Sequence, residues 1–369
     1  MIESPFTLVL SGGGMKGLAH IGVLRALHER GLVPSLVVGT SMGSLVGAVW
    51  ATGMNTAEMI IRARAIRKRD VFQIAHADMA LRRMRAPAVY RREPLDLLLH
   101  NLVGDVTFDQ LKHPLLVNTV DLNSGSQVLW GRPGFRNVRV ADAVFASCAL
   151  PGILPPREVG GRFCVDGAVV DSLPVLAAAS AALQPIFAVD VGGGASVVRK
   201  DVEHGGFAAT YMRGLEIVMQ SLTSRSLATW GEPPLALVRP RVDHIPMFAF
   251  EHTEELLNEG YRAASVTLDQ IAADGTMTTG VHPRTRMQIA VDPTRCIGCG
   301  ICAAMAPKVF RMGPNAKAEV INPRQVWSPV DGGYVHHCPT YAISATPLER
   351  SSGKTRRRSG SYPSSPGPS

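Results

Sequence analysis

A serine between two glycines is the residue of this sequence with the clearest potential to act as a nucleophile. Ser41 occupies the centre of the pentapeptide GTSMG, with Gly39 and Gly43 two positions to either side. Small residues at these positions let a strand turn sharply into a helix and expose the serine hydroxyl. The apolar residues 36–38 predict the strand, and helical spacing of later apolar residues predicts the helix: Leu45, Val46, Val49 and Trp50. We therefore predict that Ser41 is a nucleophile at a strand-to-helix turn.

A serine hydroxyl reacts when a base takes its proton and donors stabilise the oxyanion that its attack creates. Gly12, Gly13 and Gly14 follow the β-like run 7–10, and their backbone N–H groups are the candidate donors. Asp166, in the sequence VDGA, is the candidate base. The glycine loop GGGMKG fits neither GxGxxG nor GxxxxGK(S/T), so we do not interpret it as a nucleotide-binding loop. Together these residues predict acyl-transfer chemistry.

Four cysteines towards the C-terminus have the spacing of a metal-cluster motif. Cys296, Cys299 and Cys302 form CxxCxxC, and Cys338 follows at a distance, immediately before Pro339. Three closely spaced thiolates can bind three corners of a [4Fe–4S] cluster while a remote thiolate supplies the fourth ligand. A zinc site with four cysteines is the alternative, but such sites usually combine two CxxC pairs. The spacing therefore favours one iron–sulfur cluster.

The composition describes a globular chain with more than one domain. Of its 369 residues, 46% are apolar and 18% are charged, so a large core can form. The six cysteines are distributed unevenly and do not form a disulfide framework, which predicts a reducing cytoplasm. Residues 1–5 lack the basic region that opens a signal peptide.

Strand and helix patterns alternate along the chain. Beyond those around the glycine loop and Ser41, apolar runs predict strands at 115–120 and 186–191, and apolar spacing predicts a helix from near Glu254 to Ile271. The order strand, helix, strand, helix indicates an α/β fold with a mostly parallel sheet.

One apolar stretch, residues 173–191, is long enough to resemble a membrane span. Pro174, Gln184 and Pro185 interrupt it. We therefore predict a buried helix followed by a core strand.

Changes in composition divide the chain into four parts. Residues 1–272 form the predicted hydrolase domain, residues 273–286 a linker, and residues 287–348 a small iron–sulfur domain. Residues 349–369 are rich in Ser, Pro, Gly and Arg with almost nothing apolar, which predicts a disordered basic tail.

Basic residues gather in that tail and in the segment from Arg62 to Arg92, within a chain of formal net charge +8. The second cluster includes Arg64, Arg67, Lys68, Arg69, Arg82, Arg83, Arg85 and Arg91. Such clusters attract phosphate, here most simply that of anionic lipid headgroups, and we expect no nucleic-acid partner. The alternative interpretation is a solvated helix face.

Four sequence stretches, taken in order, resemble the patatin-like phospholipase family: LVLSGGGMKGLAHIGVLRAL, VVGTSMGSLVGAVWATG, ASCALPGILPP and FCVDGAVVDSLPV. The resemblance covers residues 1–272. It implies a three-layer α/β/α hydrolase core and a lipid acyl hydrolase with a Ser-Asp dyad. In this chain Ser41 would be the nucleophile, Asp166 the base, and Gly12, Gly13 and Gly14 the oxyanion hole. Where the family usually has DGG, this chain has the common variant DGA.

The stretches CIGCGICAAMAPKVF and CPTYAI resemble a bacterial-type single-cluster ferredoxin. This implies a small α+β domain whose one [4Fe–4S] cluster is held by Cys296, Cys299, Cys302 and Cys338. In two-cluster ferredoxins a further cysteine follows the third at short range. Ala306 stands at that position here, so we expect no second cluster. Related domains that lack the middle cysteine bind [3Fe–4S], and the presence of Cys299 favours the four-iron form.

Other polar or sulfur-containing residues near the motifs are interpreted as structural, since a Ser-Asp dyad requires no histidine. They are His20 as a packed histidine, Asp171 as a turn or capping acid, Cys148 and Cys164 as small core residues, and His336 and His337 as solvent-facing side chains.

The sequence therefore predicts a lipid acyl hydrolase of phospholipase A or lysophospholipase type, with a fused ferredoxin domain for electron transfer or redox regulation. The expected partners are a lipid ester substrate, an anionic membrane surface and a redox protein. The expected location is the cytoplasm, peripheral at the inner face of the membrane. The alternative is a redox-sensing or electron-transfer protein whose hydrolase-like half mainly binds lipid or a partner.

Overall fold

The computed structural model describes residues 5–75, 88–192, 202–228, 230–274, 285–327, 333–336, 338, 340 and 342–348. The chain divides into two compact units, Met1–Val281 and His282–Ser369. Helix α10 (Thr253–Asp274) and strand β9 (Thr285–Val291) each extend into the predicted linker, whose other residues lie outside the described part. The predicted basic tail, 349–369, also lies outside it.

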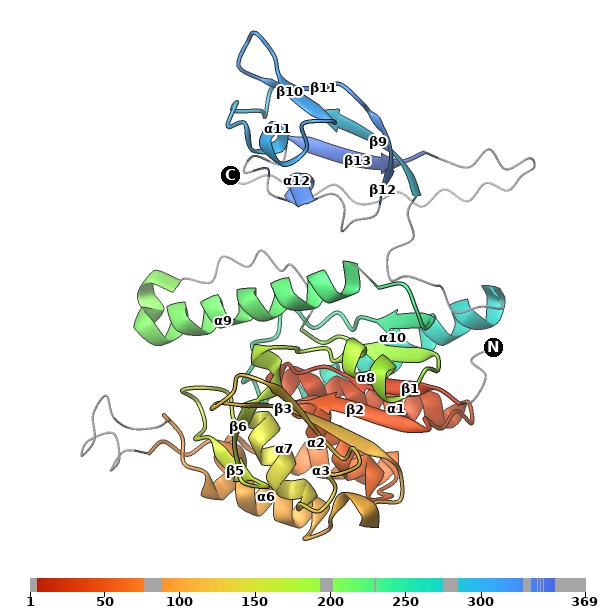
Figure 1. Ribbon diagram of the computed structural model, residues 1–369, viewed down its shortest axis with the longest axis vertical. Helices are drawn as coiled ribbons and strands as arrows, with labels where there is room; N and C mark the ends of the chain where they lie inside the picture. Colours follow the sequence, from red (N-terminus) through yellow and green to blue (C-terminus); the bar gives the residue numbers. More distant parts are fainter. Residues whose placement is uncertain are drawn as a thin grey trace. The chain divides into compact units, whose positions relative to one another are not determined.

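The first unit is built on an eight-stranded sheet of order β5-β6-β3-β2-β1-β7-β8, with β4 beside β3 (Figure 1). Its strands are β1 (Thr7–Leu10), β2 (Leu36–Thr40), β3 (Leu115–Asp121), β4 (Gln127–Trp130), β5 (Arg157–Val159), β6 (Arg162–Asp166), β7 (Ile186–Val189) and β8 (Leu235–Val238). Strands β3, β2, β1, β7 and β8 run parallel, whereas β4, β5 and β6 pair antiparallel. The predicted mostly parallel α/β sheet is confirmed.

Helices cover both faces of this sheet. They are α1 (Ala19–Glu29), α2 (Met42–Ala51), α3 (Thr56–Ala65), α4 (Lys68–Val71), α6 (Glu93–Val103), α7 (Val140–Cys148), α8 (Val175–Ala181), α9 (Val202–Ala228) and α10, with short 3-10 turns η1 (Gly14–Leu18), η3 (Phe108–Gln110) and η4 (Gly167–Val169). Side chains of a strand alternate between faces, so Leu8 and Leu10 pack with α1, α2, α7 and α10. Val9 points the other way, into a core that α8 and the end of α9 complete. The result is the predicted three-layer arrangement.

Most predicted elements of the first unit are present with adjusted ends. The strand predicted at 36–38 continues to Thr40, and the one predicted at 186–191 ends at Val189. The apolar stretch 173–191 forms helix α8 and then strand β7, as predicted. Among the described helices, none has the length and apolar content that crossing a bilayer requires.

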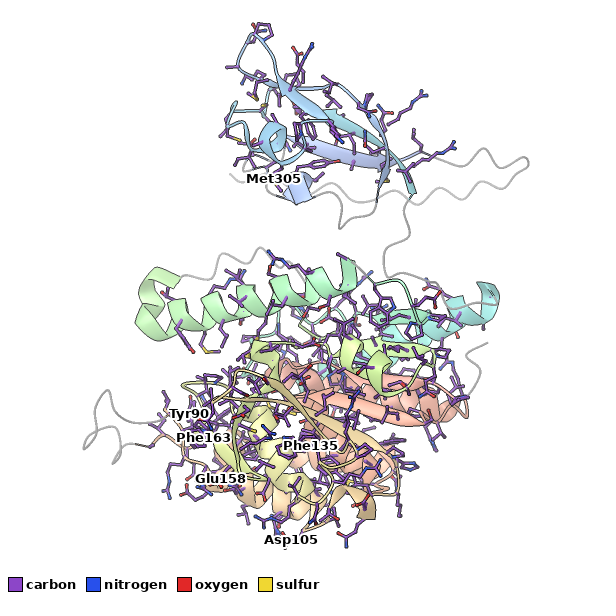
Figure 2. All side chains as sticks on the ribbon, viewed as in Figure 1. Tyr90, Asp105, Phe135, Glu158, Phe163 and Met305 are labelled. Carbon is purple, nitrogen blue, oxygen red and sulfur yellow. The ribbon has the colours of Figure 1, made fainter. Side chains whose placement is uncertain are left out.

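The antiparallel strand β4 is fixed against β3 by a buried tryptophan. The indole N–H of Trp130 donates to the Thr119 hydroxyl at 2.8 Å, and its ring packs edge-on against that of Phe135 at 5.6 Å between centroids. Phe135 is labelled in Figure 2. Thr119 stands opposite Asp166 in the ladder between β3 and β6. Trp130 therefore fixes the part of β3 that pairs with Asp166, the candidate base on β6.

The second unit contains antiparallel strands and short helices around a small core of its own. Strand β9 lies between β12 (Arg324–Trp327) and β13 (Ile343–Pro347), and β10 (Phe310–Met312) pairs with β11 (Ala318–Val320). The helices are α11 (Ile301–Met305) and α12 (Gly333–His336). Phe310 and Tyr334 pack edge-on at 4.9 Å in the core. This is the small α+β domain that the sequence predicts.

Helices α1 and α10 cross at a distance that only glycine permits. A Cβ atom at Gly22 would collide with the backbone of Leu257 and Tyr261, and one at Gly260 would collide with Ala19. The missing side chains let the two backbones touch, so α10 covers α1 closely.

We expect Gly22→Ala to destabilise the first unit by about 1–3 kcal/mol, because the added methyl overpacks this crossing. The matched control is Gly214→Ala in α9, where a Cβ meets no atom within 4 Å. That substitution should be neutral or stabilise by up to about 1 kcal/mol, since alanine favours helix. Urea unfolding of both variants measures the difference, and equal effects would contradict the close crossing.

Candidate functional site

The turn between β2 and α2 places Ser41 in a strained backbone conformation. Its φ is 54° and its ψ is −126°, a backbone conformation that residues other than glycine rarely adopt. A Cβ at Gly39 would lie 2.6 Å from the Ser44 backbone, and a Cβ at Gly43 would collide with the Leu10 carbonyl. The two glycines of GTSMG are therefore required by close backbone contacts. The strand-to-helix turn predicted from the sequence is present.

The structure brings Asp166 to this turn, at the end of β6. The Ser41 hydroxyl donates a hydrogen bond to the Asp166 carboxylate, which also accepts the Ala168 amide at 2.9 Å. Burial raises the pKa of the Asp166 carboxyl to about 7, although both hydrogen bonds act to lower it. Asp166 is therefore a buried base whose pKa lies near neutral pH, in contact with the predicted nucleophile.

The glycine loop lies against the same serine. A Cβ at Gly12 would approach the Ser41 Cβ to 3.3 Å, so these two residues are direct neighbours. The Gly12 amide donates to the Ser172 carbonyl at 3.0 Å and is thus engaged in this structure. Within the described residues, the amides of Gly13 and Gly14 have no acceptor. These two N–H groups are the ones in the loop that remain to bind an oxyanion.

The end of helix α7 contacts both Ser41 and Asp166, a connection that the sequence analysis missed. The Ser41 amide donates to the Ser147 hydroxyl at 2.8 Å, and the Asp166 amide donates to the Ala149 carbonyl at 3.1 Å. The Cys148 thiol is partly buried and packs against the core, as predicted, and it is also hydrogen-bonded to the Ser41 side chain. Cys164 is buried, as predicted. The stretch ASCALPGILPP, which resembles a family motif, contains these α7 residues and was the available sequence signal.

A buried asparagine on β3 joins the loops around the site. The Asn118 amide donates to the Thr40 hydroxyl at 3.1 Å and to the Asp171 carbonyl at 2.8 Å. Its side-chain oxygen accepts from Gln127 at 3.0 Å. A polar residue inside the apolar strand LLVNTVD was the available sequence signal. Asn118 thus connects the residue before Ser41 to the loop that follows Asp166.

Two polar side chains near the site behave as the sequence predicted. His20 is fully buried and binds the Ser11 carbonyl at 2.9 Å, and burial lowers its pKa to about 4, so it stays neutral as a packed histidine. Asp171 accepts the Leu173 amide, as a turn acid does. Burial raises the pKa of Asp171 to about 7, because its effect is larger than the opposing effect of the hydrogen bonds from Gln127 and Leu173. Asp171 Oδ1 has no hydrogen-bond partner among the described residues.

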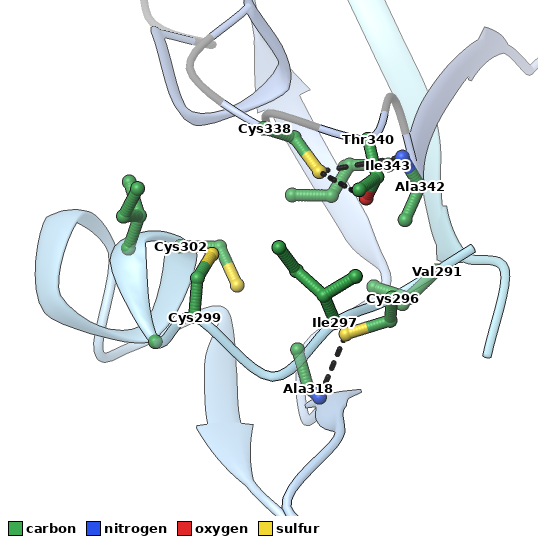
Figure 3. A pocket seen from close by; sticks show the side chains of 12 residues that line it. Val291, Cys296, Ile297, Cys299, Cys302, Ala318, Cys338, Thr340, Ala342 and Ile343 are labelled. Atoms are coloured by element: carbon green, nitrogen blue, oxygen red, sulfur yellow. Dashed lines mark hydrogen bonds between the residues drawn. The ribbon is translucent and has the colours of Figure 1, made fainter. Parts of the chain in front are cut away.

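The four C-terminal cysteines line one pocket of the second unit (Figure 3). Cys296 and Cys299 lie in the loop before α11, Cys302 lies on the helix, and Cys338 comes from the segment before β13. Gly298 and Gly300 have φ of 74° and 75°, left-handed values that let the CxxCxxC loop curl. Apolar side chains, including those of Val291 and Ile343, form the rest of the wall. The structure therefore gathers all four predicted ligands.

Backbone N–H groups point at two of these sulfur atoms. The Ala318 amide donates to Cys296 Sγ at 3.5 Å, and the Ala342 amide donates to Cys338 Sγ at 3.3 Å. Such bonds are typical of iron–sulfur sites, where they adjust the cluster potential. Across the described residues, no three His, Cys, Asp or Glu side chains are arranged to hold a single metal ion. The side chains of His336 and His337 lie outside the described part.

The described arginines of the basic segment are mostly paired. Arg62 contacts Glu58 and Arg64 contacts Glu254, at 2.8 and 2.5 Å. Arg91 and Arg92 contact acids of α6, at 3.2 and 3.4 Å. Arg82, Arg83 and Arg85 lie outside the described residues. The paired arginines fit the alternative of a solvated helix face.

Two family models match this chain. The model described as "Patatin-like phospholipase" matches residues 8–193, about half of the chain. The model described as "4Fe-4S single cluster domain of Ferredoxin I" matches residues 291–332, a range that includes the CxxCxxC motif and ends before Cys338. The first range contains every residue of the Ser41 site described above, and both resemblances seen in the sequence are confirmed.

Curated relatives share the first of these regions. An uncharacterized NTE family protein of Mycobacterium tuberculosis is 33% identical over 196 residues, which cover 53% of this chain and 51% of the relative. Lysophospholipase NTE1 of Mycosarcoma maydis is 33% identical over 190 residues, 50% of this chain and 10% of that protein. The chain thus spans about half the length of the mycobacterial relative. The solved structure of VipD from Legionella pneumophila aligns at a TM-score of 0.39 and 13% identity, over 73% of this chain and 67% of VipD.

The raised pKa of Asp166 makes a prediction about stability and pH. A carboxyl whose pKa is 3.8 when unfolded and about 7 when folded binds its proton more tightly in the folded state. The stability that this proton contributes is present below pH 3.8 and is lost as the pH rises through about 7. Asn at this position carries no charge at any pH. The gain in unfolding free energy from Asp166→Asn should therefore grow from pH 4 to pH 8, by about 1.4 kcal/mol per unit of pKa shift at most.

Denaturant unfolding at several pH values measures this gain, with Asp121→Asn as the control. The Asn123 amide lowers the pKa of Asp121, although burial acts to raise it, so its carboxylate stabilises the fold as the pH rises. The control should be less stable than the wild type by an amount that is nearly constant from pH 4 to pH 8, because its pH dependence lies below the unfolded value of 3.8. A gain for Asp166→Asn that did not depend on pH would contradict a buried carboxyl with a raised pKa.

Proposed function

This chain belongs to the patatin-like phospholipase family, and from that premise we propose that it is a lipid acyl hydrolase in which Ser41 and Asp166 form a catalytic dyad. The observation that supports the proposal best is the hydrogen bond from the Ser41 hydroxyl to the buried Asp166 carboxylate. A carboxylate in this position can accept the serine proton directly, without an intervening histidine. We propose both the lipid ester substrate and the hydrolase activity, since the curated relatives are matched over only part of their length.

Acylation begins when Ser41 Oγ attacks the ester carbonyl carbon and its proton passes to Asp166. The tetrahedral intermediate then collapses, the bond to the alcohol oxygen breaks, and the proton on Asp166 passes to the leaving alcohol. The acyl group stays on Ser41 as an ester. A pKa near 7 suits this exchange, because the group accepts and returns a proton at similar cost.

Deacylation repeats the sequence with water as the nucleophile. The water oxygen attacks the acyl-enzyme carbonyl carbon while Asp166 takes a proton from the water. When the bond between the acyl carbon and Ser41 Oγ breaks, Asp166 gives this proton to Ser41 Oγ. The free fatty acid is the product. The Cys148 thiol beside Ser41 does not compete as a nucleophile, since burial raises its pKa and keeps it protonated.

The oxyanion of both tetrahedral intermediates needs N–H donors close to Ser41. We propose the Gly13 and Gly14 amides as donors, because the Gly12 amide already binds Ser172. Helix α2 starts at Met42, and the N–H groups of a first helical turn have no intrahelical acceptors. The positive end of the α2 dipole therefore adds stabilisation at the same place.

For the second unit we propose one [4Fe–4S] cluster held by Cys296, Cys299, Cys302 and Cys338. The four thiols in one pocket and the N–H groups aimed at their sulfur atoms fit such a group. When bound, the cluster supplies one-electron transfer. Ester hydrolysis consumes no electrons, so we propose that the unit regulates the hydrolase or exchanges electrons with a separate redox protein.

We also propose a peripheral contact with anionic membrane through the basic segment between Arg62 and Arg92. Because five of its described arginines are paired with acids, the proposal depends mainly on Arg82, Arg83 and Arg85. Binding to anionic vesicles that ignored both salt and charge reversal at these three positions would contradict it.

Replacing Ser41 with alanine should abolish lipid ester hydrolysis and covalent labelling by a fluorophosphonate. The physical reason is that Ser41, at the turn between β2 and α2, is the described hydroxyl that is hydrogen-bonded to Asp166. Mass mapping of the labelled peptide and an ester assay measure the effect. The variant should keep its cluster absorption, which reports that the second unit is intact.

Labelling of the wild-type chain at another serine would overturn the assignment of the nucleophile. A chain that binds lipid and holds a reducible cluster, but is neither labelled nor active, would support the alternative of a redox protein with a lipid-binding half.

Replacing Cys338 with serine should remove most of the iron and inorganic sulfide from the purified chain, because the cluster loses its fourth thiolate ligand. The wild type should contain about four iron atoms per chain. Cys164→Ser, a buried cysteine of the first unit, is the matched control and should leave the iron content unchanged. Zinc in place of iron would identify the four-cysteine zinc site instead.

A further inference from the structure

The last residues of α7 and the residue after them connect the predicted nucleophile to the predicted base. We propose that Ser147 is a positioning residue, which holds the Ser41 turn at the spacing from Asp166 that proton transfer requires. This inference rests on the proposed function and adds a residue that acts through Ser41 rather than on the substrate.

Ser147 is fully buried, and its hydroxyl both accepts and donates a hydrogen bond. It accepts the Ser41 amide at 2.8 Å and donates to the Asn118 carbonyl of β3 at 2.7 Å. Donating to Asn118 directs a hydroxyl lone pair towards Ser41, because the single O–H is already engaged. Ser147 therefore ties the nucleophile's own backbone to the central sheet.

That tie acts on a residue in a costly conformation. A non-glycine residue at positive φ costs about 1–3 kcal/mol and persists only where its surroundings constrain it. Ser41 has φ 54°, and its amide points to Ser147 and not towards the glycine loop. Loss of the acceptor would leave a buried N–H unsatisfied and free the turn to relax.

The same short segment also holds the base. The Ala149 carbonyl, two residues from Ser147, accepts the Asp166 amide at 3.1 Å. Between them, the Cys148 thiol contacts the Ser41 side chain. One rigid segment thus binds the backbone of both dyad members, so a shift at Ser147 changes the distance between Ser41 and Asp166.

Ser44 offers a matched comparison in the same turn. It is also fully buried, and its hydroxyl donates to the Ser41 carbonyl at 2.6 Å. That carbonyl has two further donors, the Ser44 and Leu45 amides at 2.9 and 3.1 Å. Removing the Ser44 hydroxyl therefore leaves Ser41 with its carbonyl satisfied, whereas removing that of Ser147 leaves its amide without an acceptor.

The test compares Ser147→Ala with Ser44→Ala in the full chain, by ester hydrolysis and by the rate of fluorophosphonate labelling. A misplacement of about 1 Å costs about 10²-fold in rate, so Ser147→Ala should lower kcat and the labelling rate by about that factor with little change in KM. Ser44→Ala should retain both rates. Ser147→Ala should also lower the Tm more than Ser44→Ala, because it removes the partner of the Ser41 amide and of the Asn118 carbonyl, so both rates are measured well below the Tm of either variant.

The pH profile separates positioning from a loss of folded protein. The Ser41 hydrogen bond lowers the pKa of Asp166, so its weakening in Ser147→Ala should move the acid limb of kcat to higher pH. Two other titratable groups lie near Asp166. Cys148 of α7 interacts with Asp166 but stays protonated near neutral pH, because burial raises its pKa. Asp171, on the loop after η4, has a pKa of about 7 and could itself produce an acid limb. Asp171→Asn should leave the acid limb of kcat at the wild-type pH, which would exclude Asp171 as its source.

The inference is overturned if Ser147→Ala keeps wild-type rates and pH profile, or if Ser44→Ala loses as much activity. Should Ser147→Ala not yield folded protein, Ser147→Cys keeps the volume with a weaker acceptor and must show the same direction of change. A wild-type chain that fluorophosphonate does not label would instead refute the proposed function. The two failures are thus distinguishable.

Discussion

The site depends on a turn in which backbone meets backbone with no space for side chains. Gly39 and Gly43 allow helix α2 to start directly against the carbonyl end of β1, and Ser41 takes a left-handed conformation as a consequence. Everything else is arranged around this contact, because the turn cannot move without separating α2 from the sheet. The glycine loop meets Ser41 at Gly12, and the base reaches it from β6. Strain at the nucleophile is thus balanced by packing that extends through the central strands.

Burial provides the second constraint. The same enclosure that fixes Asp166 against Ser41 removes water from its carboxylate and raises its pKa to about 7, while it raises the pKa of the Cys148 thiol and lowers that of His20 to about 4. The result is a selection among nearby groups: the carboxylate becomes a base suited to neutral pH, the thiol stays protonated and the histidine stays neutral. In the proposed dyad, the carboxylate can then accept the serine proton directly, without a third residue between them.

The sequence was informative where chemistry imposes a fixed local pattern. Glycines around Ser41, the strand-helix alternation and the cysteine spacing predicted the turn, the parallel sheet and the four-thiol pocket, because each requires particular residue types at short separation. The antiparallel strands β4, β5 and β6 were missed, since their short runs have no periodic signal that distinguishes them from loops. Ser147 and Asn118 were missed for a different reason. The contacts that tie them to the Ser41 site join residues 29 to 106 positions apart, so the local patterns that contain these residues do not identify their partners.

The two units carry chemistries that share no intermediate, and the placement of sulfur in the chain reflects this. Within the described part, the cysteine beside the nucleophile donates no electrons to the reaction and has a pKa raised by burial. The four cysteines suited to a cluster are all in the second unit, where the amides of Ala318 and Ala342 donate to two of the four sulfur atoms. In the proposed mechanism, hydrolysis moves protons between Ser41, Asp166 and water, and none of these steps transfers an electron. Any influence of the cluster on the hydrolase must therefore act through a change in structure or charge that alters the fit between Ser41 and Asp166. The α7 segment binds the backbone of both residues, so a shift of this segment would alter that fit.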